Sequence, residues 1–147
     1  MEILQVKQIH KIYGEKENKV YALKNVSFSV RQGEFIAIVG TSGSGKSTLL
    51  NLIGGLDTPT QGQIIIRGHD ISALQRKELT IFRRRNVGFV FQNYSLMPVL
   101  NVYDNVALPV TFDKGKHIDH RYIKELLEEL GLWEKRTRYP NELSGGQ

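Results

Sequence analysis

The sequence of 147 residues contains no cysteine, which excludes disulfide bonds and thiolate metal sites. It also lacks long apolar segments: the longest uninterrupted runs, such as residues 35–39, fall far short of the roughly 20 residues that a membrane-spanning helix needs. Its first ten residues, MEILQVKQIH, show neither the basic start nor the continuous apolar stretch of a signal peptide. These absences favour a cytosolic protein.

The charge is weakly basic, because 20 Lys and Arg residues outnumber 15 Asp and Glu residues and give a formal net charge of +5. This excess suits an anionic partner but is too small to choose among nucleic acid, phosphate and a membrane surface. The densest cluster, residues 83–85, is typical of the basic C-terminal end of a helix. Only one aromatic residue, Phe82, adjoins it, so we expect no nucleic-acid partner.

The first part of the chain alternates strand patterns with helix patterns. Residues 2–9 alternate imperfectly between apolar and polar side chains, and residues 20–30 show a second extended pattern; both predict strands, as do residues 62–68. Two compact apolar runs, residues 35–39 and 87–91, predict strands that are buried on both faces. Helices are predicted for residues 48–53, which end at two glycines, and for residues 72–85. This alternation indicates a parallel α/β architecture.

From residue 93 the pattern becomes mostly helical. In residues 117–131, Ile123, Leu126, Leu127 and Leu130 recur at helical spacing, with Asp119 near the start and Gly131 after the end. We therefore predict an α/β core in residues 1–92 and a helical subdomain in residues 93–147.

The motif with the clearest chemistry is GTSGSGKS, from Gly40 to Ser47, which satisfies the spacing G-x-x-x-x-G-K-[ST] between a predicted strand and a predicted helix. Glycines let several backbone N–H groups converge on phosphate oxygens, and the helix adds the positive end of its dipole. Lys46 would bridge the outer phosphates in a catalytic role, and the Ser47 hydroxyl would help to hold Mg²⁺. A plain glycine turn is the alternative, but a turn has no need of the lysine or the hydroxyl. We predict binding of a nucleoside triphosphate.

The last five residues, LSGGQ at 143–147, follow the phosphate loop and the helical stretch in the same chain. With the phosphate loop and the stretches VYALKNVSFSV, VGFVFQNYSLMP and NVALP, the chain resembles the ATP-binding subunit of an ABC transporter, most closely the MacB and LolD type. Thr41 stands where a proline is common in that branch. The resemblance implies an α/β P-loop NTPase fold of the ABC type, with N-terminal β-strands and a helical subdomain, and an ATPase activity that powers a bacterial exporter.

The resemblance also implies roles for single residues. Tyr13 matches the aromatic residue that stacks on adenine, and Gln92 matches a catalytic glutamine that reaches Mg²⁺ and the attacking water. The expected ATP-binding residues are Tyr13, Gly40, Thr41, Ser42, Gly43, Ser44, Gly45, Lys46, Ser47 and Thr48. The signature residues expected to bind the ATP of a second subunit are Ser144, Gly145, Gly146 and Gln147.

The same resemblance implies partners and a location. Two ATPase subunits would form a head-to-tail homodimer with two composite ATP sites. Residues 95–100, SLMPVL, would dock on a transmembrane permease at the cytoplasmic face of the membrane; the alternative is that their apolar side chains belong to the core of the helical subdomain. ATP and Mg²⁺ are the implied cofactors.

The family has further catalytic elements after its signature, namely a strand with the catalytic glutamate and a switch histidine. None of these residues occurs here. All four histidines precede residue 143, so none of them is the switch histidine. We therefore expect an N-terminal fragment of the domain that does not hydrolyse ATP by itself. Two alternatives stay open: an ABC protein without a transport function, and an isolated nucleotide-binding module.

Overall fold

The computed structural model describes residues 1–113, 115 and 117–147. The chain forms two compact units, Met1–Phe89 and Val90–Gln147. The assignment of ATP binding to residues 1–92 and of a helical subdomain to residues 93–147 stays a prediction.

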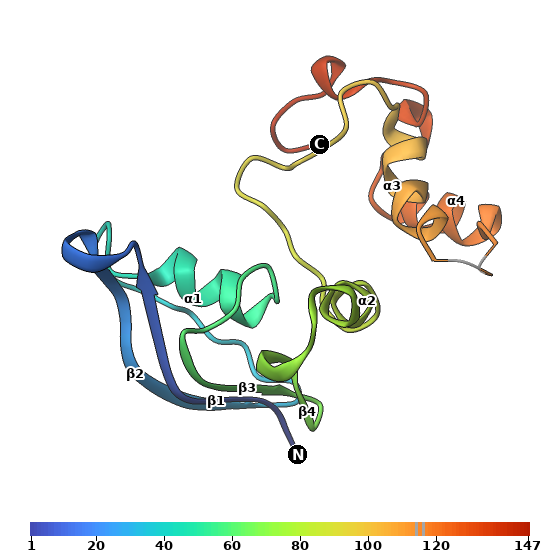
Figure 1. Ribbon diagram of the computed structural model, residues 1–147. Coiled ribbons are helices and arrows are strands. Elements are labelled where there is room, and N and C mark those ends of the chain that lie inside the picture. The colour runs from blue at the N-terminus through green and yellow to red at the C-terminus, as the bar shows by residue number, and fades with distance from the viewer. Residues whose placement is uncertain (114, 116) are drawn as a thin grey trace. The chain divides into compact units, whose positions relative to one another are not determined.

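The first unit is built on an antiparallel sheet with the strand order β2-β1-β3-β4 (Figure 1). Its strands are β1 (Glu2–Tyr13), β2 (Val20–Arg31), β3 (Gln61–Ile66) and β4 (His69–Asp70). The three strand predictions for this sheet are confirmed, and β1 extends four residues further than its pattern indicated, from residue 9 to residue 13. Between β3 and β4, Arg67 and Gly68 both have positive φ angles, as a tight two-residue hairpin turn requires.

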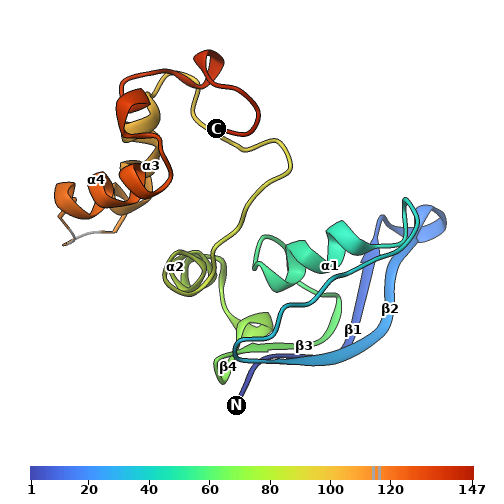
Figure 2. The same ribbon diagram turned by 180° about the vertical axis from the view of Figure 1, so that it is seen from behind.

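Two helices belong to this unit, α1 (Lys46–Ile53) and α2 (Arg76–Asn86), and both were predicted. Figures 1 and 2 show α1 lying along one face of the sheet. Leu49 and Leu52 of α1 are buried against Val6, Ile9 and Ile64 of the strands. Short 3₁₀ helices, η1 (Lys16–Asn18) and η2 (Ile71–Ala73), complete the unit. The sheet and α1 therefore share one core, and this core anchors the start of α1.

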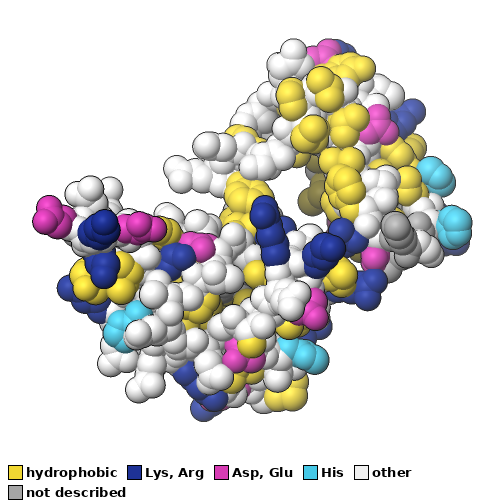
Figure 3. Space-filling view, in the orientation of Figure 1, with side chains coloured by type: hydrophobic (Ala, Val, Ile, Leu, Met, Phe, Trp, Pro, Cys, Tyr) yellow, Lys and Arg dark blue, Asp and Glu magenta, His cyan; other side chains and the backbone are white. Residues whose placement is uncertain are grey.

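The predicted buried strands at residues 35–39 and 87–91 are wrong for this structure. Neither segment forms a strand, and Phe35, Val39 and Val90 are 95%, 86% and 93% exposed. A central parallel strand obtains its hydrogen bonds and its burial from neighbours on both sides, and within the described residues no strand pairs with either segment. Hydrophobic side chains are correspondingly visible on the surface of each unit in Figure 3.

The second unit is helical, as its sequence predicts. It contains α3 (Val102–Thr111), α4 (His120–Glu129), η3 (Trp133–Lys135) and η4 (Pro140–Glu142). Its core lies between α3 and α4 and is made of Val102, Ala107, Ile123 and Leu127. Leu130, which the helical spacing placed on the same face, is 70% exposed because it caps the C-terminal end of α4.

Side chains cap both long helices of the second unit. The side chain of Asn101 accepts a hydrogen bond from the Asp104 amide, and that of Asp119 accepts one from the Tyr122 amide. Such caps satisfy backbone donors that the first turn leaves unpaired. None of the helices in the described part of the chain combines the length and the apolar character that crossing a membrane would take.

Candidate nucleotide-binding site

The phosphate loop owes its shape to two glycines. Gly43 has a φ angle of 77° and Gly45 one of 92°, a conformation that L side chains rarely adopt. A Cβ atom on Gly45 would lie 2.5 Å from the Ala22 carbonyl oxygen and 2.9 Å from the Leu23 side chain. Glycine at position 45 is therefore required twice, by the backbone conformation and by the close approach of β2.

Lys46, the first residue of α1, folds its side chain back over the loop. Its ammonium donates hydrogen bonds to the carbonyl oxygens of Gly40, at 2.9 Å, and Thr41, at 2.6 Å. The Ser44 hydroxyl lies 3.4 Å from the same nitrogen. The positive charge is thus held inside the curl of the loop, where phosphate oxygens would approach.

A cavity of about 230 Å³ opens at this point. From the loop and helix it is lined by residues Gly43, Ser44, Gly45, Lys46, Ser47 and Thr48. The first turn of α1 leaves the amides of Lys46, Ser47 and Thr48 without helical acceptors, and the Leu49 amide makes the first helical bond, to Gly45. Backbone donors, a hydroxyl and an ammonium thus converge on one anion-sized space.

The opposite wall of this cavity was not predicted. It consists of Val20, Tyr21 and Ala22, the first residues of β2. Val20 and Tyr21 are 61% and 52% exposed, although both are paired with residues of β1. Their alternating pattern predicts only a strand, so the sequence carried no local signal for this role.

Tyr13 lies beside that wall, because it pairs with Val20 across the antiparallel strands β1 and β2. Tyr13 is 40% exposed, and its hydroxyl donates a hydrogen bond to Asp57 Oδ2 at 2.9 Å. Paired residues on antiparallel strands have Cα atoms about 4.5–5.5 Å apart. The predicted base-stacking residue is therefore adjacent to a residue that lines the phosphate-loop cavity.

The environment of Asp57 shifts the pKa of its carboxyl. Partial burial raises the pKa of its carboxyl, but hydrogen bonds from the Lys11 ammonium, the Thr58 amide and the Tyr13 hydroxyl outweigh burial, helped by the charge of Lys11. The pKa of Asp57 consequently lies below its ordinary value, and the carboxylate form is favoured.

Gln92, the other predicted catalytic residue, is exposed in a turn of the second unit, whereas Lys46 and Ser47 belong to the first unit. The predicted Mg²⁺ ligands Ser47 and Gln92 are therefore divided between units, and their joint role stays a prediction. Ser47 lines the phosphate-loop cavity, so its hydroxyl oxygen is available there to a hard cation. Within the ranges that the structure describes, no cluster of three His, Cys, Asp or Glu residues could hold a metal by itself. These donors fit Mg²⁺, which usually binds few protein groups together with substrate phosphates.

The signature residues close a turn at the end of the second unit. The Ser144 amide donates to Gln147 Oε1 at 3.1 Å, and the Gln147 amide donates to the Ser144 carbonyl at 2.9 Å. A Cβ atom on Gly145 would lie 3.3 Å from the Tyr94 hydroxyl. A cavity of about 410 Å³ is lined by Tyr94, Leu96, Ser144, Gly145 and Gln147, among others. One residue of the predicted docking segment, Leu96, thus lines the same cavity as the signature residues.

The 3₁₀ turn before the signature is held by a short ion pair. Glu142 accepts hydrogen bonds from the Tyr139 amide at 2.8 Å and from Arg138 at 3.0 Å. The Tyr139 amide and then the Arg138 guanidinium hold the pKa of Glu142 below its ordinary value. This capping arrangement orients η4, which leads directly into the signature.

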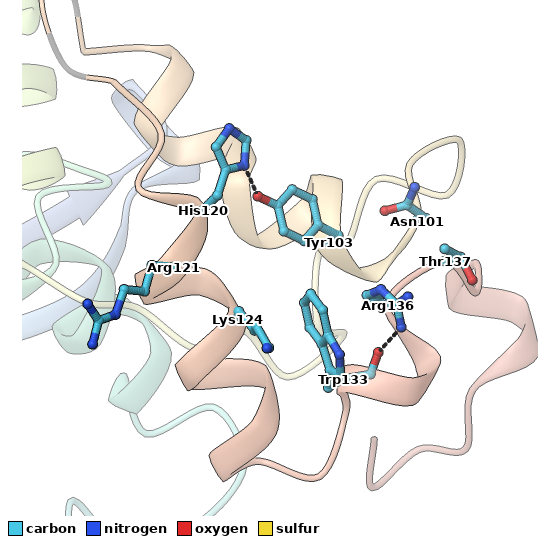
Figure 4. A pocket seen from close by; sticks show the side chains of 8 residues that line it. All are labelled: Asn101, Tyr103, His120, Arg121, Lys124, Trp133, Arg136 and Thr137. Carbon is cyan, nitrogen blue, oxygen red and sulfur yellow. Dashed lines mark hydrogen bonds between the residues drawn. The ribbon is translucent and has the colours of Figure 1, made fainter.

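A third cavity, of about 560 Å³, lies between α3, α4 and η3 (Figure 4). Figure 4 shows the Trp133 ring between Lys124 and Arg136, whose cationic groups lie 5.6 and 4.4 Å from the ring centroid. Tyr103 shares a hydrogen bond with His120 Nδ1 at the same cavity. No sequence prediction concerned this site, and its cations already have partners, since Lys124 pairs with Glu128 and Arg136 donates to the Trp133 carbonyl.

The glycine loop, the lysine inside it and the helix that starts there define a P-loop nucleotide-binding protein. A family model described as ABC transporter matches residues 23–147. The chain belongs to the ABC transporter family. The predicted fold class and family resemblance are therefore confirmed.

Individual relatives agree with this assignment. The chain is 44% identical, over its whole length, to the bacitracin export ATP-binding protein BceA of Halalkalibacterium halodurans, and spans 58% of that protein. It is 45% identical to the macrolide export ATP-binding/permease protein MacB of Mannheimia succiniciproducens, of which it spans 23%. A solved dimeric structure of the ATP-binding cassette MJ0796, in a post-hydrolysis state with ADP and Pi bound, is 42% identical and matches with a TM-score of 0.87 over 98% of this chain and 64% of that one.

Proposed function

We propose that the chain is the nucleotide-binding part of an ATPase that powers a bacterial membrane exporter. The observation that carries the proposal is the cavity at the start of α1, where Lys46, Ser47 and the first-turn amides face one space. The relatives named for bacitracin and macrolide export support export as the process.

In this proposal each residue of the loop has a distinct task. The amides of residues 42–48 bind the β- and γ-phosphates, and Lys46 exchanges its contacts with loop carbonyls for contacts with phosphate oxygens. Ser47 and Gln92 would hold Mg²⁺, which would neutralise phosphate charge. Gln92 also orients the attacking water, and Tyr13 stacks on the adenine ring.

A second copy of the subunit completes the site. Ser144, Gly145, Gly146 and Gln147 would contact the γ-phosphate held by the partner's phosphate loop, through a hydroxyl, backbone amides and a side-chain amide. The dimeric structures of a 42% identical cassette support this arrangement. By two-fold symmetry, such a dimer contains two composite ATP sites.

The permease would dock on residues 95–100. In this segment Leu96, Met97 and Val99 are 46%, 46% and 75% exposed. The Asn105 side chain accepts a hydrogen bond from the Met97 amide at 2.8 Å and donates to the Leu100 carbonyl at 2.9 Å. The segment thus presents apolar side chains on a backbone that α3 holds in place, which is typical of a protein-docking surface. Docking there would place the protein at the cytoplasmic face of the membrane.

The proposal is tested by measuring ATP hydrolysis of the full-length protein, alone and with its permease in proteoliposomes. We expect hydrolysis that requires Lys46 and Mg²⁺ and that rises when the permease is present. Hydrolysis that ignores the permease would favour an ABC protein without a transport function. Binding without any hydrolysis would leave only a nucleotide-binding module.

A further inference from the structure

Three side chains form a connected network beside the phosphate-loop cavity. The Lys11 ammonium donates hydrogen bonds to Asp57 Oδ1 at 2.8 Å and to the Thr58 carbonyl at 2.7 Å. The other oxygen of Asp57, Oδ2, accepts the hydrogen bond of the Tyr13 hydroxyl. Lys11 also lies over the Tyr13 ring, with its nitrogen 4.8 Å from the ring centroid. Each member of the network therefore contacts both others.

The network joins two segments that are far apart in the sequence. Lys11 and Tyr13 belong to β1, whereas Asp57 and Thr58 lie in the loop between α1 and β3, which runs beside β1 in both Figure 1 and Figure 2. Two further bonds join the same segments: the Ile12 amide donates to Thr60 Oγ1, and the Thr60 amide donates to the His10 carbonyl. The loop that follows the phosphate-binding helix is thus fastened to the strand that carries Tyr13.

These contacts restrict the Tyr13 ring in two ways. The hydrogen bond to Asp57 fixes the hydroxyl end, and Lys11, which is only 9% exposed, covers one face of the ring. The remaining surface leaves Tyr13 40% exposed, so the ring still has room for a flat partner. Asp57 is in turn held by its bonds to Lys11 and to the Thr58 amide. A ring restrained in this way loses little side-chain freedom when a base stacks on it.

We propose that Lys11 and Asp57 are positioning residues, which hold the Tyr13 ring in the orientation that stacks on the base of the bound nucleotide. This inference rests on the proposed function, since it assumes that a nucleotide occupies the phosphate-loop cavity beside Val20. Neither residue touches the nucleotide in this proposal, because both act through Tyr13. Their effect is therefore confined to ligands that carry a base.

That confinement separates a positioning role from a structural one. Inorganic tripolyphosphate offers the phosphate loop the same charged groups as ATP but has no base. Loss of ring positioning weakens the binding of ATP and leaves the binding of tripolyphosphate unchanged. A distorted loop or an unfolded fraction of the protein weakens the binding of both ligands. The ratio of the two dissociation constants is thus the informative quantity.

The experiment measures both dissociation constants by calorimetry on the full-length protein, for the wild type, four single variants and the double variant of Tyr13→Ala with Asp57→Asn. Tyr13→Ala removes the ring and should weaken ATP binding by about 5- to 150-fold, the usual range for one base–aromatic stack. Asp57→Asn and Tyr13→Phe keep the ring but remove part of its restraint. They should weaken ATP binding by about two- to tenfold, the range for one side chain that must be ordered on binding. Glu2→Gln is the matched control, because it alters a different hydrogen-bonded carboxylate, which lies on β1. It should change neither dissociation constant.

In the expected result, tripolyphosphate binds all variants equally, and Asp57→Asn adds nothing to Tyr13→Ala in the double variant. Tyr13→Phe keeps the ion pair of Lys11 and Asp57 intact, so it reports on the tether even if Asp57→Asn folds poorly. The inference is overturned if Tyr13→Ala weakens ATP binding while Asp57→Asn and Tyr13→Phe leave it unchanged. It is also overturned if all three variants weaken the binding of tripolyphosphate as much as that of ATP. Should Tyr13→Ala leave ATP binding intact, the stacking role in the proposed function falls together with this inference. Loss of Lys46 tests the phosphate site separately.

Discussion

The ammonium of Lys46 donates a hydrogen bond to the carbonyl oxygen of Thr41, 2.6 Å away in the same phosphate loop. The charge is therefore already stationed where an anion would bind, and replacing Lys46 by Ala removes it without touching the core. We expect ATP affinity to fall by about 10- to 150-fold, which corresponds to the loss of a hydrogen bond to a charged group worth about 1.5–3 kcal/mol. Calorimetric titration of full-length protein measures this change. Lys7→Ala on β1 is the control, and an unchanged affinity in Lys46→Ala would remove the lysine from the site.

Gly45→Ala should destabilise the first unit. The new Cβ would lie 2.5 Å from the Ala22 carbonyl oxygen, in a residue that keeps a φ angle of 92°. A strained backbone conformation of this kind costs about 1–3 kcal/mol, and the clash adds to it. Gly88→Ala is the matched control, because a Cβ atom there has no neighbour within 4 Å and its φ angle is not positive. Urea unfolding followed by circular dichroism measures both, and equal stability of the two variants would contradict the geometry.

Much of the first unit could be predicted from local patterns. Alternation in residues 2–9 and 20–30 predicts β1 and β2, and the glycines after residue 53 predict the end of α1. The runs at residues 35–39 and 87–91 show the limit of this reasoning. Their apolar composition indicates a preference for burial between two neighbours, but composition does not determine whether those neighbours exist in the same chain. The observed exposure of Phe35 and Val90 follows from the pairing of the sheet and not from their own sequence.

The candidate site shows the same division between local and tertiary information. Residues 40–47 predict the phosphate loop from sequence alone, because the spacing of its glycines, lysine and hydroxyl is set within one short segment. Asp57 and Val20 had no such signal, since their roles arise from the loop after α1 meeting β1 and from β2 passing the phosphate loop. Gln92 and Ser47 belong to different units, so their joint binding of Mg²⁺ stays a prediction.

The ion pair of Lys11 and Asp57 should make stability depend on pH in the acid range. Because the pKa of Asp57 is lower in the folded state, its contribution is complete above the ordinary carboxyl value, about 3.9, and is lost as pH falls through the lower folded-state value. At neutral pH, Asp57→Asn should lower the free energy of unfolding by about 1 kcal/mol, a figure reduced for the partial exposure of the carboxylate. Urea titrations between pH 2 and 7 should show the difference from wild type shrinking towards low pH. A difference that grows on acidification would have the wrong sign.

Substitution in the signature should abolish ATP-dependent dimerisation. Ser144→Arg places a long cation in the turn closed by Ser144 and Gln147, where the partner's γ-phosphate is proposed to bind. The larger side chain blocks close approach of the two subunits, so the full-length variant should remain monomeric with ATP. Light scattering after size-exclusion chromatography, with a slowly hydrolysed analogue, measures the mass. Glu129→Arg, which introduces the same side chain at an exposed position of α4, should still dimerise, and dimerisation of both variants would place the composite site elsewhere.

The docking segment gives the last prediction. Val99 is 75% exposed on a backbone that Asn105 holds through Met97 and Leu100, so Val99→Asp should alter the surface without disturbing the fold. A charge at the centre of an apolar contact must be desolvated on binding, and loss of a central contact costs about 2 kcal/mol or more. Affinity for the permease in nanodiscs should therefore fall at least about 30-fold, which is that free energy converted at 1.4 kcal/mol per tenfold change.

The control for this substitution is Leu130→Asp, which changes another exposed aliphatic residue of the same unit, 70% exposed at the end of α4. We expect it to bind the permease as the wild type does, and both variants to keep the wild-type circular dichroism and melting temperature. Biolayer interferometry on full-length protein measures the two affinities. If Leu130→Asp weakened binding and Val99→Asp did not, the permease would bind the end of α4 instead of residues 95–100.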